Sequence, residues 1–211
     1  MIYLEDEYPQ GSDEWQAIRA GKVTASKITD IMAKLKSGKP SAGRTTYMGQ
    51  LIAERLTGVK SDSFSNAAMQ WGIETEPQAR AAYEFLNDVE VKQYSFIDHP
   101  TIELAGMSPD GMVDKDGLFE AKCPNTATHI EYIISKKFPK KYIDQVQWQM
   151  ACSGRLWADL CSFDPRMPEH LRMFILRVER DDKYIEEMEI EVVKFNSEID
   201  EKISLLEKHE K

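Results

Sequence analysis

Apolar residues recur at three- and four-residue steps over much of the first ninety positions, and this is the period of amphipathic helices. Glycine and proline interrupt the pattern in residues 36–43 and predict a basic loop there. Ser12 is a suitable N-terminal cap, Gly58 is a suitable C-terminal cap, and Pro77 must either kink its helix or begin a second one. The helices expected in this part are residues 13–20, a helix that follows Thr24-Ala25-Ser26 and runs through Met32, and residues 45–57 and 66–87.

Beyond residue 90 the pattern changes to short apolar runs, which are typical of strands. The strands expected are residues 91–97, 102–107, 111–113, 118–121, 156–163 and 173–178. Asp116-Gly117 is a favoured tight turn, so a hairpin is expected around it. Helices are expected near 127–135 and 141–153, and the last thirty residues have a long amphipathic pattern. This order predicts an α/β fold with a mixed central sheet flanked by helices, rather than a repeating βαβ barrel.

No linker or low-complexity tract divides the 211 residues, so we expect a single domain over 1–211. It would comprise a basic helical part over 12–88, a sheet core over 90–180 and a C-terminal helix over 181–209. No apolar stretch approaches the roughly 18 residues of a membrane span. The acidic N-terminus does not resemble a secretory leader, and three cysteines at irregular spacing favour reduced thiols. We therefore expect a cytoplasmic location and no membrane association.

The net charge is −9, which taken alone argues against a nucleic-acid-binding protein. The charge is unevenly distributed, however. Residues 19–60 hold nine lysines and arginines and two acids, whereas residues 181–211 hold eleven acids and five lysines. This asymmetry is typical of a protein with one face for an anion and another for solubility. Two ordinary solvated helical faces would explain it equally well.

The segments Ser108-Pro109-Asp110-Gly111 and Leu118-Phe119-Glu120-Ala121-Lys122 hold the most informative chemistry. Alternate residues of a strand point to one face, so Glu120 and Lys122 are expected to project together toward Asp110. Two carboxylates beside a lysine favour a divalent cation such as Mg²⁺ between the acids. The lysine could orient or deprotonate the attacking water, or hold the phosphate. The alternative is an exposed hairpin on which these residues have no catalytic role.

These two segments resemble the core of the PD-(D/E)XK nucleases. The chain as a whole resembles the phage lambda exonuclease and YqaJ-like viral recombinase family through blocks in the same order along nearly its full length. The blocks are Trp15…Arg19-Ala20-Gly21…Thr24-Ala25-Ser26, Trp71-Gly72…Glu76, the core segments above, Tyr142…Gln145-Val146-Gln147, Asp164-Pro165-Arg166-Met167 and Glu179-Arg180-Asp181…Lys183-Tyr184. The resemblance implies a restriction-endonuclease-like fold.

The resemblance also implies the roles of individual residues. Asp110, Glu120 and the carbonyl of Ala121 would bind one Mg²⁺, and Glu76 would complete a site for a second; Mn²⁺ is a possible substitute. Lys122 would help to activate water. The pocket for a 5′-terminal phosphate would be lined by Arg19, Thr24, Ser26, Ser108 and Gln145. Lys36 would reach the minor groove, and Met69 would be a wedge at the terminal base pairs.

Physical considerations leave some of these roles open. Arg19 could form a surface ion pair instead, and Met69 could simply fill a gap in the core. Pro77 directly follows Glu76 and makes the placement of that carboxylate uncertain. Gln145 and Gln147 are expected on one helix, so only one of them should face the site, and the resemblance favours Gln145.

The function implied is a Mg²⁺-dependent exonuclease that digests one strand of linear duplex DNA from a 5′-phosphorylated end in the 5′-to-3′ direction. Its products would be mononucleotides and a 3′ overhang. The resemblance implies a ring-shaped homotrimer around the DNA and a single-strand annealing protein as partner. The alternatives are an endonuclease or junction resolvase with the same core, and a non-catalytic scaffold that binds DNA ends in recombination.

Overall fold

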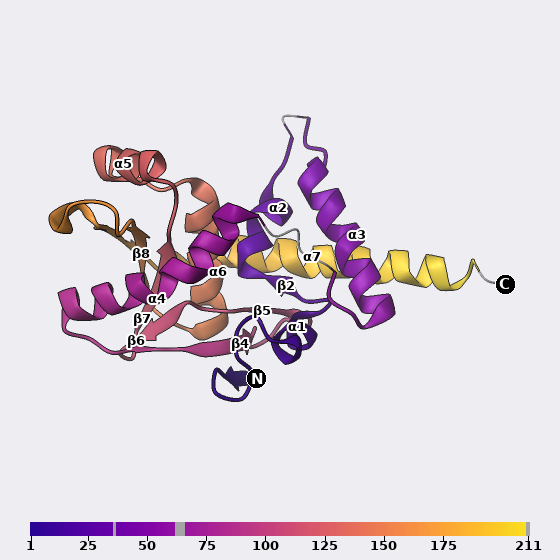
Figure 1. Ribbon diagram of the computed structural model, residues 1–211. Helices are drawn as coiled ribbons and strands as arrows, with labels where there is room; N and C mark the ends of the chain where they lie inside the picture. The colour runs from indigo at the N-terminus through magenta and orange to yellow at the C-terminus, as the bar shows by residue number, and fades with distance from the viewer. Residues whose placement is uncertain (36, 62–65, 210–211) are drawn as a thin grey trace.

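The computed structural model describes residues 1–35, 37–61 and 66–209. Within these residues the strands form two sheets (Figure 1). The first sheet has the order β1-β4-β5-β2 and consists of β1 (Ile2–Leu4), β2 (Val23–Thr24), β4 (Tyr94–Asp98) and β5 (Ala105–Met107). The second has the order β3-β6-β7-β8-β9 and consists of β3 (Val91–Lys92), β6 (Gly111–Val113), β7 (Gly117–Lys122), β8 (Trp157–Phe163) and β9 (Met173–Glu179).

Both sheets are mixed, because β2 pairs with β5 and β7 pairs with β8 in parallel, whereas the other strand pairs are antiparallel. The helices are α1 (Asp13–Arg19), η1 (Ala25–Lys27), α2 (Ile28–Met32), α3 (Ala42–Thr57), α4 (Ala67–Asn87), α5 (Thr126–Ser135), α6 (Lys140–Ser153), η2 (Glu169–Leu171) and α7 (Asp182–Glu207). The mixed α/β class with flanking helices is confirmed, and the strands are shared between two sheets.

The helix ends follow the predicted capping chemistry. The Ser12 side chain accepts a hydrogen bond from the backbone N–H of Trp15, and Gly58 ends α3 in the left-handed conformation with φ 69°. Pro77 lies inside one helix that continues from Ala67 to Asn87, so the proline does not begin a second helix. The hairpin of β6 and β7 forms as expected, but its turn is residues 114–116, because Asp114 takes the left-handed conformation with φ 47° and Gly117 already pairs with Val113 as the first residue of β7.

The expected strand over residues 102–107 is shorter in the structure, and β5 begins at Ala105. The reason is a turn that precedes it. The His99 ring accepts backbone N–H groups of Thr101 and Ile102, and Leu104 has φ 53°. A residue in the left-handed region cannot continue an extended strand. The expected strand over 91–97 is likewise divided, because β3 and β4 belong to different sheets.

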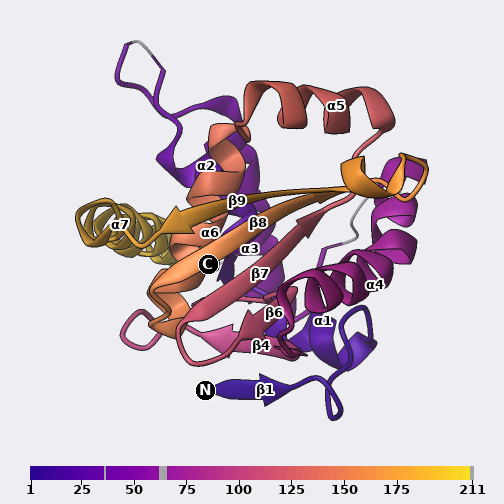
Figure 2. The same ribbon diagram turned by 90° about the vertical axis from the view of Figure 1, so that its left-hand side faces the viewer.

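The two faces of the second sheet are covered by different helices. Phe119 of β7 packs on Tyr83 of α4, with ring centroids 4.8 Å apart, whereas Leu118 belongs to the core cluster that includes Trp148 of α6. Figure 2 shows β7, β8 and β9 side by side, with α4 on one side of them and α6 on the other. Successive residues of β7 therefore face two different helices.

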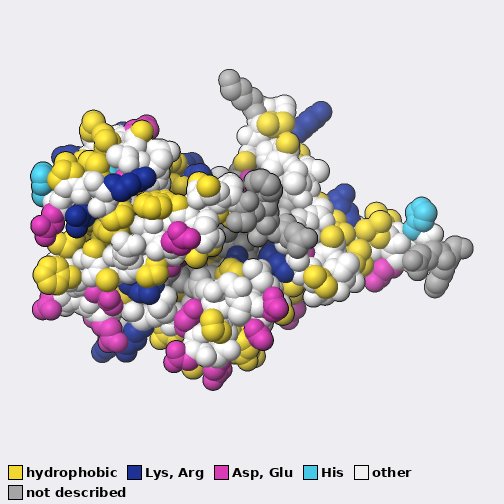
Figure 3. All heavy atoms as spheres, viewed as in Figure 1, with side chains coloured by type: hydrophobic (Ala, Val, Ile, Leu, Met, Phe, Trp, Pro, Cys, Tyr) yellow, Lys and Arg dark blue, Asp and Glu magenta, His cyan; other side chains and the backbone are white. Residues whose placement is uncertain are grey.

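The basic and acidic segments seen in the sequence pair with one another. Arg44 and Arg55 of α3 form ion pairs with Glu198 and Asp200 of α7, and Lys34 pairs with Glu191. On the face shown in Figure 3, the described basic side chains are interspersed with acidic ones. The asymmetry along the sequence thus becomes an interface between helices, which neither of the two explanations anticipated. No helix among the described residues is long and apolar enough to span a membrane.

Candidate active site

The second strand of the hairpin carries two charged side chains toward α6. Glu120 and Lys122 occupy alternate positions of β7, and the Lys122 ammonium forms an ion pair with Glu120. Glu120 is almost completely buried, with about 1% of its surface exposed. A buried charge needs partners to offset its lost hydration, so these residues are not an exposed hairpin pair.

Asp110 lies directly before β6, and the hairpin returns the chain so that β7 passes beside it. The Asp110 Oδ2 atom accepts the backbone N–H of Ala121 at 2.8 Å. The preceding carbonyl, that of Pro109, accepts a hydrogen bond from Gln10 Nε2 at 2.9 Å. These contacts fix the Asp110 carboxylate beside the backbone that separates Glu120 from Lys122.

Two glutamines of α6 bind the Glu120 carboxylate. Gln145 Nε2 donates to Glu120 Oε1 at 2.6 Å, and Gln149 Nε2 donates to Oε2 at 2.7 Å. Gln147, between them, faces away and donates to the carbonyl of Glu179. Gln145 is thus the residue of the expected pair that faces the site. Sequence reasoning missed Gln149, although a spacing of four residues from Gln145 places both side chains on one helix face.

Glu76 of α4 adds a third carboxylate, and the charges repel one another. Burial and the charges of Glu120 and Glu76 raise the pKa of Asp110 well above its ordinary value. Burial and the charge of Glu120 raise the pKa of Glu76 as well. Burial alone would lower the pKa of Lys122, but Glu120 and Asp110 outweigh it and raise that pKa. The three acids are opposed by Lys122 and, at Glu76, by Arg80, so the site has an excess of negative charge.

The chemistry of these side chains fits a divalent cation. Carboxylate oxygens are the ligands that Mg²⁺ prefers, and crowded acids with raised pKa values are stabilised when a cation joins them. In the parts of the chain that the structure describes, no three His, Cys, Asp or Glu side chains are gathered closely enough to hold a metal ion as they stand. The Lys122 ammonium is the cation beside Glu120 in this arrangement. Ala121 donates its N–H to Asp110, and its carbonyl stays a predicted metal ligand.

A second cluster lies on the N-terminal side of Asp110. The Arg19 guanidinium stacks over the Trp15 ring at 3.9 Å from its centroid, and Trp15 Nε1 donates to Ser108 Oγ at 3.0 Å. Thr24 is buried and pairs across β2 and β5 with Gly106, two residues before Ser108. The fold therefore brings three of the expected pocket residues, Arg19, Thr24 and Ser108, to one region. Trp15 joins two of them, a contact that the sequence did not predict.

Arg19 has no ion-pair partner among the described residues, and its Nε atom is buried without a hydrogen-bond acceptor there. Burial lowers the pKa of Arg19 to about 10, with Tyr47 and Glu54 acting in the opposite direction. The guanidinium is thus still charged at neutral pH. A buried, charged donor without an acceptor is a suitable partner for an anion, so the surface ion pair considered for Arg19 is not what the structure has.

The other residues expected in the site are exposed at the protein surface or lie outside the described residues. Ser26 is exposed in the short helix η1, and Met69 is 45% exposed in the first turn of α4 rather than in the core. Lys36 falls outside the described residues. The structure therefore groups Asp110, Glu120, Lys122, Glu76 and Gln145 around one set of charges. In the part of the chain that it describes, no hydrogen bond or ion pair joins Ser26 or Met69 to them.

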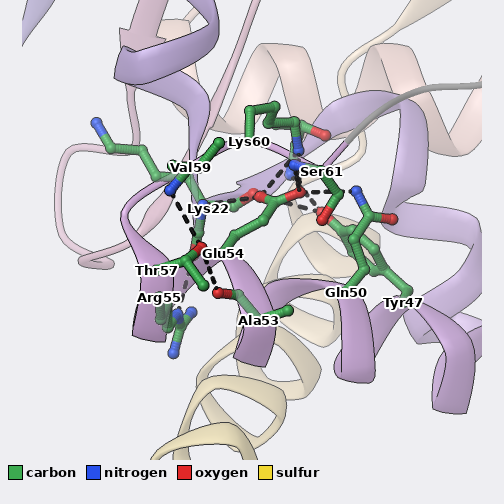
Figure 4. Close-up of polar contacts among 12 residues, drawn as sticks. Lys22, Tyr47, Gln50, Ala53, Glu54, Arg55, Thr57, Val59, Lys60 and Ser61 are labelled. Atoms are coloured by element: carbon green, nitrogen blue, oxygen red, sulfur yellow. Dashed lines mark hydrogen bonds and ion pairs between the residues drawn. The ribbon is translucent and has the colours of Figure 1, made fainter.

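A buried glutamate, Glu54, lies close enough to Arg19 for its charge to act on the guanidinium. Glu54 of α3 accepts hydrogen bonds from the Lys60 ammonium at 2.8 and 2.9 Å, from the Gly21 N–H at 2.9 Å and from Gln50 at 2.8 Å (Figure 4). The Tyr47 hydroxyl nearby accepts the N–H of Thr24. These bonds fasten both ends of the turn between α1 and β2, so they fix the backbone that carries Arg19 and Thr24.

The fold and the arrangement of Asp110, Glu120 and Lys122 define a PD-(D/E)XK-like core. The family model of the YqaJ-like viral recombinase domain matches residues 14–156, and the chain belongs to that family. Among solved structures it is similar to the alkaline exonuclease LHK-Exo of Laribacter hongkongensis, with 47% sequence identity and a TM-score of 0.87 over 94% of this chain and 97% of that chain.

The structure of LHK-Exo in complex with dAMP gives 48% identity and a TM-score of 0.88 over the same shares of the two chains. A phage related exonuclease from Haemophilus somnus 129PT, 18% identical, shares the fold with a TM-score of 0.72 over 88% of this chain and 96% of that chain. No curated protein sequence matches the chain. The family and the similarity to LHK-Exo support a nuclease of the viral recombinase family.

Proposed function

We propose that this chain is a divalent-metal-dependent exonuclease that digests one strand of duplex DNA from a 5′-phosphorylated end, in the 5′-to-3′ direction, and releases mononucleotides. The observation that carries the proposal is the placement of Asp110, bonded to the N–H of Ala121, beside the ion pair of Glu120 and Lys122, with Glu76 near enough for its charge to raise the pKa of Asp110. Binding of DNA alone would gain nothing from carboxylates next to phosphates, because like charges repel. A scaffold without catalysis is therefore disfavoured.

The proposal gives each of these residues a role in catalysis. Asp110, Glu120 and Glu76 would hold Mg²⁺, or Mn²⁺ in its place. A bound divalent cation lowers the pKa of water and offsets the negative charge that develops on the phosphate. Lys122, whose raised pKa keeps it protonated at neutral pH, would bind a phosphate oxygen or orient the attacking water as a hydrogen-bond donor. Gln145 would hold the Glu120 carboxylate in place.

Arg19 supports the requirement for a 5′-phosphate. A guanidinium offers a fixed fork of donors that matches a terminal phosphate, which carries more charge than an internal phosphodiester. The cluster of Arg19, Thr24 and Ser108 lies next to the proposed catalytic carboxylate in the chain, because Ser108-Pro109-Asp110 are consecutive residues. A phosphate held there would place the first phosphodiester bond of the strand toward Asp110. Ser26, Gln145, Lys36 and Met69 remain part of the proposal on the resemblance.

The proposal includes a ring-shaped homotrimer that encloses the DNA, a single-strand annealing protein as partner and a location in the cytoplasm. An enclosing ring would account for the activity of an acidic chain on DNA, because only the channel lining has to attract phosphates. The 3′ overhang left by digestion would be the substrate of the annealing protein.

The proposal can be tested on linear duplexes labelled separately at each terminus. We expect Mg²⁺-dependent release of mononucleotides from 5′ ends and no cleavage of a covalently closed circle. The wild-type protein should digest a 5′-phosphorylated duplex about tenfold to a hundredfold faster than a 5′-hydroxyl duplex, since one charge-assisted contact is worth roughly 1.5–3 kcal/mol. The variant Arg19→Met should lose this preference.

The matched control is Arg44→Met, which removes another buried arginine of the basic segment, one paired with Glu198 away from the catalytic carboxylates. This variant should keep the preference for 5′-phosphate even where its stability falls. Cleavage of the closed circle would instead indicate an endonuclease, and equal rates on the two duplex ends would contradict the pocket.

A further inference from the structure

Gln149 of α6 has an unusual environment for a buried side chain. It is about 1% exposed, and its Nε2 atom donates to Oε2 of Glu120 at 2.7 Å. Its Oε1 atom is buried and has no hydrogen-bond partner among the described residues. An unpartnered buried acceptor lowers stability, so a glutamine here is unfavourable unless its amide N–H group is needed.

The orientation of this amide follows from its partner. A carboxylate only accepts hydrogen bonds, so the nitrogen of Gln149 must face Glu120 and the oxygen must point away from it. Exchanging the two atoms would bring an amide oxygen against a negative charge. The unpartnered Oε1 is therefore a consequence of the contact with Glu120.

The two oxygens of Glu120 differ in how many donors they already have. Oε1 accepts from both Lys122 and Gln145, which occupies both of its lone pairs. Oε2 accepts from Gln149 alone. Because each carboxylate oxygen has two lone pairs, the position left open on Glu120 belongs to Oε2, the atom that Gln149 holds.

We propose that Gln149 is a positioning residue that fixes Oε2 of Glu120 so that its free lone pair is presented to a divalent cation. This inference rests on the proposed function, because it takes Glu120 as a metal ligand. Residues that hydrogen-bond to metal ligands orient them, and their removal typically weakens metal affinity about tenfold to a hundredfold. Gln149 differs from Gln145 in that it contacts the less occupied oxygen and lies deeper in the core.

The test is calorimetric titration of the full chain with Mn²⁺ in the absence of DNA. The variant Gln149→Met keeps the length of the side chain but removes the donor, and Gln147→Met is the matched control. Gln147 lies on the same helix and is also buried, but it bonds to the carbonyl of Glu179 and to the N–H of Asp181. We expect Gln149→Met to bind Mn²⁺ about tenfold to a hundredfold more weakly than the wild type, and Gln147→Met to bind it as the wild type does.

Thermal unfolding and Mn²⁺ affinity together separate this role from a structural one. Gln149→Met removes an unpartnered acceptor but leaves Oε2 of the buried Glu120 without its donor, and Gln147→Met loses two satisfied bonds, so both variants should melt below the wild type without metal. A role in stability alone would therefore give the two variants similar Mn²⁺ affinities, whereas the positioning role predicts weaker affinity in Gln149→Met only. If Gln149→Met does not fold, Gln149→Asn, which keeps the amide but shortens its reach, should show the weakened Mn²⁺ affinity. The Mg²⁺ concentration for half-maximal hydrolysis should rise by the same factor as the Mn²⁺ dissociation constant.

The outcomes distinguish this inference from the proposed function. Mn²⁺ affinity within twofold of the wild type in Gln149→Met, together with loss of binding in Glu120→Gln, would overturn the role of Gln149 and leave the metal site standing. Equal Mn²⁺ binding, or none, in the wild type and in Glu120→Gln would overturn the metal site itself. Weakened affinity in Gln149→Met and not in Gln147→Met would support the inference.

Discussion

Glu54 and Glu120 are both almost completely buried, and each is bonded to a lysine and to at least one glutamine. Glu54 also accepts two backbone N–H groups, from Gly21 and Ser61. Burial tends to raise the pKa of Glu54, but the hydrogen bonds from Lys60 and Gly21 prevail and lower it. Its negative charge is thus fully compensated.

The surroundings of Glu120 differ because other carboxylates lie nearby. Its charge raises the pKa values of Asp110 and Glu76, although Lys122 and, at Glu76, Arg80 act in the opposite direction. The contrast shows that burial of a glutamate beside a lysine does not by itself mark a catalytic site. A catalytic site is indicated when further carboxylates lie near the buried glutamate and the fold does not supply enough cations to offset their charge.

The largest effect is expected when the charge at the uncompensated site is removed. Glu120→Gln keeps the shape of the side chain but should lower the hydrolysis rate by about a thousandfold or more, because several kcal/mol of transition-state stabilisation depend on the bound cation. The measurement is nucleotide release from a 5′-phosphorylated linear duplex with saturating Mg²⁺. DNA-end binding, measured by fluorescence anisotropy, should be largely unchanged. Hydrolysis at the wild-type rate would contradict the site.

The same substitution at the compensated site should affect stability rather than metal chemistry. Glu54→Gln leaves Lys60 without its counter-ion, and breaking a buried pair costs about 3 kcal/mol. This corresponds to roughly 10 °C in melting temperature for a chain of this size. The Mn²⁺ affinity of the folded variant should equal that of the wild type. An unchanged melting temperature would show that the Glu54 cluster does not stabilise the fold.

The contribution of Glu54 to the free energy of unfolding depends on pH in a definite direction. The folded-state pKa of Glu54 lies below its ordinary value of 4.5. The stability from its ionised form is therefore present above about pH 4.5 and is lost as the pH falls through the folded pKa. Unfolding free energies of the wild type and of Glu54→Gln should converge in strongly acidic solution. A constant difference over this range would contradict the assignment.

A smaller effect on the stability of the fold, opposite in sign to that of Glu54, is expected at Asp110. Its folded-state pKa is raised above the ordinary value of 3.8, so its ionisation destabilises the metal-free fold as the pH rises from about 4 toward neutrality. Asp110→Asn should therefore raise the stability of the metal-free protein at pH 7 by on the order of 1 kcal/mol. Urea unfolding with a chelator present measures this difference.

Added Mg²⁺ provides the control for that measurement. A cation bound only by the folded wild type stabilises it by mass action, so the advantage of Asp110→Asn should shrink or reverse when Mg²⁺ is added. A variant that is less stable than the wild type at pH 7 without metal would show that the negative charges near Asp110 are compensated after all.

The sequence by itself determined the local features of the site. The short hairpin turn over residues 114–116 and the alternation of β7 place Glu120 and Lys122 on one face, because both depend on residues close together in the sequence. The order of the motifs indicated the family, which the comparisons confirm. The same reasoning identified Gln145 and not Gln149, because only the former lies in a motif that the resemblance carries.

Only the tertiary structure decided which charges remain without compensation. The basic residues of 19–60 looked like an anion-binding face, yet four of the nine pair with acids that lie far away in the sequence, as Arg44 and Arg55 do with Glu198 and Asp200 of α7. Arg19 has no such partner among the described residues, and Glu120 lies among other acids. Compensation of a charge depends on groups that approach from separate elements, and no local pattern encodes which elements will meet.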